Sequence, residues 1–273
     1  MSAYDKIFKP KQIRLANGKV VLQPRSRTIP IVLIIAMLSY ISIFLTGFNM
    51  SDLIERGHEF FVILEQMFPP NWAYTSRIWE PLFDTIKMSL FGTFLGGALA
   101  IPFAIIASSN LVKSRLIIII TRVFISFLRT FPALVTALIA TFIFGLGTVA
   151  GTTAITLFTF SYLAKLLYEF IETVDMGPYE AMEAMGLGKI KAFLVSIYPQ
   201  VFPQYMSNVL YCFEGNVRHA AILGYVGAGG IGLILNEKLG WREYSNVGMV
   251  LTCLFVTVFI IETLSRYLRS KLV

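Results

Sequence analysis

Charged residues are scarce in this sequence of 273 residues, because Asp, Glu, Lys and Arg make up only 14% of it, whereas soluble globular domains carry about 25%. Cysteine and histidine are also scarce, with two of each, and Cys212 and Cys253 both lie within apolar runs, so we predict neither a disulfide framework nor a metal centre. Apolar residues reach 56%, which excludes a disordered chain, a collagen-like repeat and a coiled coil. A soluble domain of this length cannot bury so much apolar surface, so the composition predicts a polytopic membrane protein.

The apolar residues fall into six runs that can each cross a bilayer, for which about 20 residues are needed. We therefore expect an all-α integral membrane fold with transmembrane helices at residues 29–48, 88–107, 116–144, 152–171, 201–223 and 247–264. The first run is interpreted as a membrane helix and not as a signal peptide, because it has no small-residue cleavage site. On the second run, Gly92 and Gly96 predict close helix packing. The third run contains Arg122 and Arg129, so its first turns are expected at the membrane surface, and Pro132 is expected to kink it.

The uneven distribution of Lys and Arg indicates how the helices are oriented. Residues 1–28 hold seven Lys and Arg against one Asp, a net charge of +6, and the end of the chain adds Arg266, Arg269 and Lys271. The segment between the first two runs holds six acidic residues against two arginines. We therefore predict a basic cytoplasmic tail at 1–28, an external loop at 49–83 and both termini in the cytoplasm. A regulatory or nucleic-acid role of the tail is the alternative interpretation of its charge.

Residues 172–199 form a cytoplasmic segment that is longer than a simple connection requires. Pro178 suits the start of a helix, and residues 180–185 are good helix formers. Gly186 can end that helix, because glycine adopts a positive φ without steric cost, and residues 189–198 then form a second helix. The pattern predicts two short helices joined at a glycine turn and exposed to a cytoplasmic partner.

The same segment resembles the EAA signature of ABC-importer permeases. Four residues match that signature in register and three depart from it: Glu180, Ala181, Gly186 and Pro199 match, and Met182, Ser196 and Tyr198 depart. In that family the segment forms coupling helices that bind a separate ATPase subunit. The resemblance implies that the ATPase-coupling residues are Glu180, Ala181, Glu183, Ala184, Gly186 and Pro199. A merely amphipathic surface loop is the alternative.

Residues 213–232 are similar to the F-E-x-N-V-R-x-A-x-x-L-G-x-V-G-A-G-G-I-G stretch of phosphonate-transporter permeases, and residues 128–132 resemble their L-R-x-x-P element. A looser form of the first stretch occurs in methionine-type permeases. The resemblance covers residues 84–268 and implies the methionine-permease-like fold of type I ABC-importer permeases. It also implies a location in the bacterial inner or cytoplasmic membrane, a homodimer of this permease, an ATPase partner that binds ATP, and an extracytoplasmic substrate-binding protein. We expect contact with the lipid bilayer, no nucleic acid and no cofactor in this chain.

Glu214 and Arg218 lie near the middle of the fifth run, one helical turn apart and so on one face. Charges within a membrane are costly, and pairing lowers that cost. The pair is interpreted either as a structural salt bridge or as part of the translocation path, to which Arg129 and Asn216 are also assigned. Our hypothesis is that Arg218 helps to pass a phosphonate-like oxyanion, because a guanidinium offers paired donors to such groups.

Two glycine patterns resemble nucleotide sites without their structural context. Gly227, Gly229 and Gly232 fit G-x-G-x-x-G but follow a membrane span, and Gly188-Lys189 lacks the other residues of a P-loop. We therefore expect that this chain is not an enzyme and that a partner hydrolyses ATP. A permease for methionine, phosphite or another small anion is the alternative within transport. A membrane-embedded lipid enzyme and an ion channel are the alternatives outside it.

Overall fold

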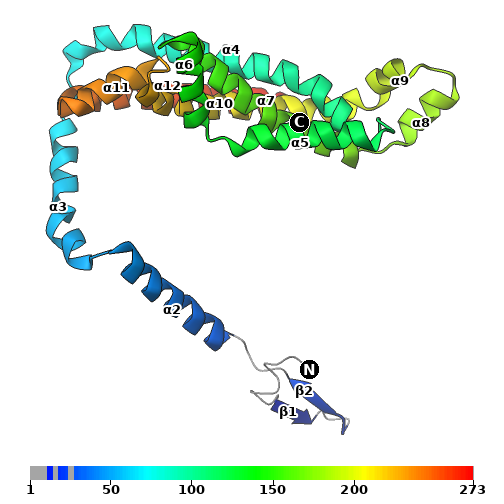
Figure 1. The fold of residues 1–273 in the computed structure, drawn as a ribbon, viewed down its shortest axis with the longest axis horizontal. Helices are drawn as coiled ribbons and strands as arrows, with labels where there is room; N and C mark the ends of the chain where they lie inside the picture. The colour runs from blue at the N-terminus through cyan, green and yellow to red at the C-terminus, as the bar shows by residue number, and fades with distance from the viewer. Residues whose placement is uncertain (1–10, 15–17, 24–27, 273) are drawn as a thin grey trace. The chain divides into compact units, whose positions relative to one another are not determined.

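The computed structural model describes residues 11–14, 18–23 and 28–272 (Figure 1). The chain divides into two compact units, Met1–Val62 and Ile63–Val273. Four of the seven Lys and Arg residues of the predicted tail lie outside the described residues: Lys6, Lys9, Arg25 and Arg27. The cytoplasmic position of this tail therefore stays a prediction.

The described residues of the first unit form a short hairpin followed by helices. Strands β1 (Lys11–Arg14) and β2 (Val20–Gln23) pair in antiparallel register, with Arg14 opposite Val20. Helix α2 (Thr28–Thr46) contains no charged residue and corresponds to the first predicted span. Helix α3 (Met50–Met67) follows at an angle of 72° and continues into the second unit. The segment predicted as an external loop is thus largely helical.

The second unit is a helical bundle. Its elements are η1 (Trp72–Tyr74), α4 (Thr75–Ala107), α5 (Arg115–Thr130), α6 (Ala133–Phe144), α7 (Thr148–Thr173), α8 (Gly177–Ala184), α9 (Lys189–Ser196), α10 (Tyr198–Leu223), η2 (Gly224–Val226), α11 (Ile231–Gly240) and α12 (Tyr244–Leu272). In Figure 1, α4, α7, α10 and α12 run beside one another, α8 and α9 project from one end of the bundle, and α11 lies at the other end.

Three stretches are individually long and apolar enough to cross a membrane: Trp72–Ala107, Thr148–Thr173 and Tyr244–Leu272. Three bent pairs reach that length together, namely α2 with α3, α5 with α6, and α10 with α11, which gives up to six spans among the described residues. The third predicted run is not one kinked helix, because α5 and α6 are inclined by 91°. The break falls at Phe131 and Pro132, since proline disfavours a helical conformation in the residue before it.

Helices α4 and α7 pack closely along a row of small residues on α4. Gly92, Gly96, Ala100 and Ala104 recur every four residues and are buried. A Cβ atom added at Gly96 would lie 2.7 Å from the carbonyl oxygen of Thr156, so no larger residue fits there without a shift of the backbone. The close packing predicted from Gly92 and Gly96 is confirmed.

The glycine-rich stretch after α10 forms a tight turn at the end of the bundle that carries α11. It follows η2 and precedes α11, so its context is helical and not that of a dinucleotide-binding βαβ unit. The Gly147 N–H donates to the carbonyl oxygen of Gly227 at 2.9 Å, and the Ile231 N–H donates to the Thr85 hydroxyl oxygen at 2.8 Å. These bonds fasten the turn to the start of α7 and to the third turn of α4.

Candidate functional site

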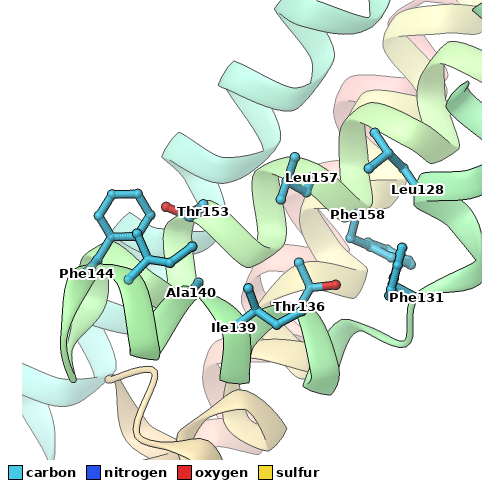
Figure 2. Close-up of a pocket in the computed structure, with 10 residues that line it drawn as sticks. Leu128, Phe131, Thr136, Ile139, Ala140, Phe144, Thr153, Leu157 and Phe158 are labelled. Carbon is cyan, nitrogen blue, oxygen red and sulfur yellow. The ribbon is translucent and has the colours of Figure 1, made fainter.

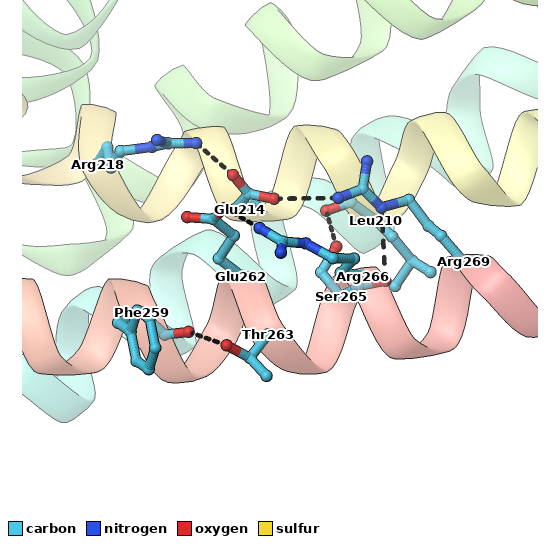
Figure 3. Close-up of polar contacts among 9 residues, drawn as sticks. All are labelled: Leu210, Glu214, Arg218, Phe259, Glu262, Thr263, Ser265, Arg266 and Arg269. Carbon is cyan, nitrogen blue, oxygen red and sulfur yellow. Dashed lines mark hydrogen bonds and ion pairs between the residues drawn. The ribbon is translucent and has the colours of Figure 1, made fainter.

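Three charged side chains meet between α10 and α12 (Figure 3). The side chain of Glu214 is only 6% exposed, and its carboxylate accepts from Nη2 of Arg218 at 2.5 Å and from Nη2 of Arg269 at 3.5 Å. Glu214 and Arg218 share one face of α10, as expected from their spacing of four residues. We refer to Glu214, Arg218 and Arg269 as the charge cluster. Two arginines and one glutamate give it a net charge of +1.

The part that Arg269 plays in this cluster was missed by the sequence reasoning, which assigned this residue to the topology signal at the chain end. Its side chain lies back along α12, where its Nε donates to the carbonyl oxygen of Ser265 at 3.4 Å (Figure 3). Its guanidinium is also 5.7 Å from the centre of the Tyr211 ring. Arg269 and Glu214 are 55 positions apart, so no local pattern links them, and only the packing of α12 on α10 reveals the contact.

Half of the Arg218 side chain is exposed, and it lies in a groove between α7 and α10. Phe158 and Tyr162 of α7 and Tyr211 and His219 of α10 also line this groove, which we refer to as the basic groove. The rings of Phe158 and His219 are 5.8 Å apart, centre to centre. Aromatic walls thus surround an arginine that is tied to Glu214 on one side.

Arg129 lies near the basic groove but outside the charge cluster. It is exposed in the last turn of α5 and forms no ion pair with any described residue. It is close enough to Tyr162, which lines the groove, for its charge to act on the tyrosine hydroxyl. The structure therefore places a further positive charge beside the groove.

Asn216 is almost fully buried and ties three helices together. Its Nδ2 donates to the hydroxyl oxygens of Thr93 on α4 and Thr159 on α7, both at 2.8 Å. Asn216 is two residues from Glu214, so the two side chains leave α10 in nearly opposite directions. Asn216 also lines the basic groove together with Arg218, but its amide nitrogen is engaged in helix packing.

A second groove adjoins the basic groove at Phe158 and is almost entirely apolar (Figure 2). It lies between the α5–α6 bend and α7, with Phe131 and Phe144 among its walls. The hydroxyls of Thr136 and Thr153 also line it, but each donates to a carbonyl oxygen of its own helix. An anion therefore finds donors in the basic groove and not in this apolar groove.

The segment 172–199 contains the two short helices predicted for it, α8 and α9, with a turn at Gly186. Gly186 adopts φ +86°, and its N–H donates to the carbonyl oxygen of Glu183 at 2.9 Å. The Leu187 N–H donates to the carbonyl oxygen of Met182 at 3.1 Å. Pro178 lies in the first turn of α8, as expected.

The coupling residues that the family resemblance implies lie on the surface of this segment. Glu180, Ala181, Glu183, Ala184, Gly186 and Pro199 are all exposed. Met185 and Ile190 add apolar surface beside them, with 64% and 78% exposure. Tyr179 faces inward and donates to Glu183 at 3.3 Å, and burial together with the Glu183 charge raises the pKa of Tyr179. The outer surface thus combines acidic and apolar side chains on a well-anchored base.

Pro199 lies at the start of the helix that connects this segment with the charge cluster. It lies in the first turn of α10, and the helix continues without a break past Glu214 to Leu223. The side-chain amide of Gln200 donates to the carbonyl oxygens of Asp175 at 3.3 Å and Ser196 at 2.9 Å. The two ends of the segment are thereby held together at the start of α10.

Comparison with known proteins gives matches over most of the bundle. Residues 100–272 match the family described as binding-protein-dependent transport system inner membrane component. The phosphate-import permease protein PhnE of Mycolicibacterium smegmatis is 35% identical over 212 residues, which cover 77% of this chain but only 40% of that protein. The phosphite transport system permease protein PtxC of Stutzerimonas stutzeri is 33% identical over 203 residues, 74% of each chain.

A solved structure of the MetNI methionine ABC transporter in an inward-facing conformation shares the fold. It aligns with a TM-score of 0.65 and 18% identity, covering 74% of this chain and 99% of that chain. At this level of identity the likeness concerns the fold alone.

Proposed function

This chain belongs to the family of inner membrane components of binding-protein-dependent transport systems, and we propose that it is the substrate-conducting subunit of an ATP-driven importer for phosphonates or related phosphorus oxyanions. Its fold is that of the type I ABC-importer permeases. The names of two relatives, which refer to phosphate and to phosphite, support this class of substrate.

The observation that carries the proposal is the exposed half of Arg218 in the basic groove. A guanidinium has several N–H donors in one plane, and Arg218 uses one hydrogen bond, to Glu214, among the described residues. Its remaining donors suit two oxygens of a tetrahedral oxyanion. Arg269 offsets the charge of Glu214, and Arg129 adds positive charge nearby, so the groove favours an anion.

The segment 172–199 is proposed to bind a separate ATPase, which binds and hydrolyses ATP, so that this chain has no catalytic role. Its exposed acidic and apolar side chains form a compact surface for that partner. A homodimer of the permease would enclose the path, and an extracytoplasmic binding protein would deliver the substrate. Closure of the ATPase dimer on ATP binding would move α8 and α9, and α10 would carry the movement from Pro199 to Glu214.

Purification of the tagged chain from its native membranes tests the class of protein. We expect an ATPase subunit to co-purify, and the absence of one would contradict the proposal. The complete transporter in proteoliposomes, with its binding protein, then tests the substrate. Radiolabelled methylphosphonate, phosphite or phosphate should accumulate with ATP, whereas preferential uptake of radiolabelled methionine would overturn the proposed substrate class.

A further inference from the structure

A polar junction joins the ends of α4 and α7 to α5, and we define it by Ser109, Arg122 and Glu172. The Glu172 carboxylate accepts from the Ser109 N–H at 2.8 Å and from the Ser109 hydroxyl at 2.5 Å, and it pairs with the guanidinium of Arg122. Beside it, the side-chain amide of Asn110 donates to the carbonyl oxygen of Ile171 at 3.1 Å. The last turn of α7 is thus fastened both to α5 and to the segment that follows α4.

Arg122 uses each side of its guanidinium at this junction. Its Nε donates to the carbonyl oxygen of Ala107, the last residue of α4, at 3.0 Å. Its Nη2 pairs with Glu172, and the group lies 4.7 Å from the centre of the Tyr168 ring. The C-terminal ends of α4 and α7 carry partial negative charge, to which Glu172 adds, so one arginine stabilises all three. Loss of either partner would leave a partly buried charge unpaired.

The junction lies where the segment 172–199, which we call the coupling segment, meets the bundle. Glu172 is the first residue of 172–199, and Arg122 lies on α5, whose far end turns by 91° into α6. Phe131 at that bend lines the apolar groove, and Arg129, two residues before it, lies beside the basic groove. Helix α5 therefore connects the start of the coupling segment with the walls of both grooves.

We infer that Arg122 and Glu172 are positioning residues that transmit the movement of the coupling segment through α5 to the groove walls. Helix α10 connects the end of the segment to the charge cluster, and the junction connects its beginning to the α5–α6 bend. Movement at either end of the segment would then reach a different wall of the path. The inference rests on the proposed importer function.

The test measures uptake per ATP hydrolysed in proteoliposomes that hold the complete transporter, with radiolabelled methylphosphonate as the probe. Glu172→Gln removes the charge but keeps the size of the side chain, and Arg122→Lys keeps the charge but cannot bind Ala107 and Glu172 together. We expect ATP hydrolysis to continue in Glu172→Gln while uptake per ATP falls about tenfold, the scale of one charged hydrogen bond. Arg122→Lys should show a smaller decrease.

Glu169→Gln is the matched control, because Glu169 lies one turn earlier on α7 and pairs with Lys165 of the same helix at 3.5 Å. It should keep wild-type uptake per ATP. A merely structural role would lower uptake and ATP hydrolysis together with the amount of assembled complex, and an unchanged ratio would overturn the inference. If Glu172→Gln fails to assemble, Ser109→Ala removes a single hydroxyl and should lower the ratio by about threefold; an unchanged ratio there would equally overturn it.

The wild-type transporter shows whether a negative result contradicts the role of the junction or the proposed importer function. A wild type that accumulates the probe with ATP, next to variants with unchanged coupling, contradicts only the role of the junction. A wild type that accumulates no phosphorus oxyanion contradicts the proposed function itself.

Discussion

The charge cluster and the polar junction both pair arginine with a buried or partly buried glutamate, but they use the arginine differently. At the junction, the arginine that pairs with Glu172 also binds the Ala107 carbonyl oxygen and lies against the Tyr168 ring. In the charge cluster, two arginines share Glu214, and half of Arg218 stays exposed in the basic groove. An arginine that binds two helix ends holds helices together, whereas one that uses a single hydrogen bond has more donors left to bind a ligand.

Removal of the spare donors should have the largest effect. We expect Arg218→Leu to lower the initial rate of methylphosphonate uptake by about a hundredfold, because about two charged hydrogen bonds to the oxyanion are lost. Assembly with the ATPase should persist, since Glu214 keeps its contact with Arg269. The measurement is uptake by the reconstituted transporter, normalised to the amount of complex.

Arg266→Leu is the control for this substitution. Arg266 pairs with Glu262 at the same spacing of four residues, at 2.7 Å, but its side chain is 74% exposed and belongs to α12. It should transport like the wild type. Full uptake by Arg218→Leu at normal protein levels would make the charge cluster a structural salt bridge, and the contrast with the junction would disappear.

A break in the coupling segment should disconnect both the charge cluster and the polar junction from the movement of α8 and α9. We expect its effect on uptake to be smaller than that of Arg218→Leu. Gly186 adopts φ +86°, whereas proline holds φ at about −65° and has no N–H, so Gly186→Pro cannot keep this turn or its hydrogen bond to Glu183. We expect ATP hydrolysis to continue and uptake per ATP to fall about tenfold. Gly188→Pro is the matched control, because Gly188 already has φ −62°. Equal coupling in the two variants would argue against a role of this turn.

Replacing the tyrosines that lie beside Arg122 and Arg269 should have the smallest effects. One substitution should change stability, and the other should change uptake. Tyr168→Leu removes the ring next to Arg122 and should lower the free energy of unfolding by about 1–2 kcal/mol, with uptake per complex near that of the wild type. Tyr211→Leu removes a ring of the basic groove next to Arg269 and should lower uptake several-fold with little loss of stability. Thermal unfolding and uptake, measured on both variants, check this. A loss of uptake in Tyr168→Leu and a loss of stability in Tyr211→Leu would contradict the view that Arg122 holds helices together and that the basic groove binds substrate.

Features that depend on neighbouring residues in the chain were predictable from the sequence. The apolar runs follow from composition alone, and the turn between α8 and α9 follows from Pro178 and Gly186, whose preferences are local. The pairing of Glu214 with Arg218 follows from the helical repeat. The fold class and the surface position of the coupling residues rest on such local signals, together with the family resemblance.

Features that depend on tertiary packing were not predictable in this way. Arg269 reaches Glu214 across 55 positions, and Arg122 reaches Glu172 across 50 positions, so neither contact has a spacing rule. Pro132 indicated a kink, but the angle of 91° is set by how α5 and α6 pack on α7. Asn216 was assigned to the path by its motif, whereas its bonds to α4 and α7 emerge only from the bundle.

The central claim is that the planar donors of Arg218, and not only its charge, receive the substrate. It is tested most directly by the initial rate of ATP-driven uptake of radiolabelled methylphosphonate in the wild type and in Arg218→Lys. Lysine keeps the positive charge but lacks the planar pair of donors, so we predict a decrease of about tenfold with normal assembly. Equal rates in the two transporters would contradict the claim.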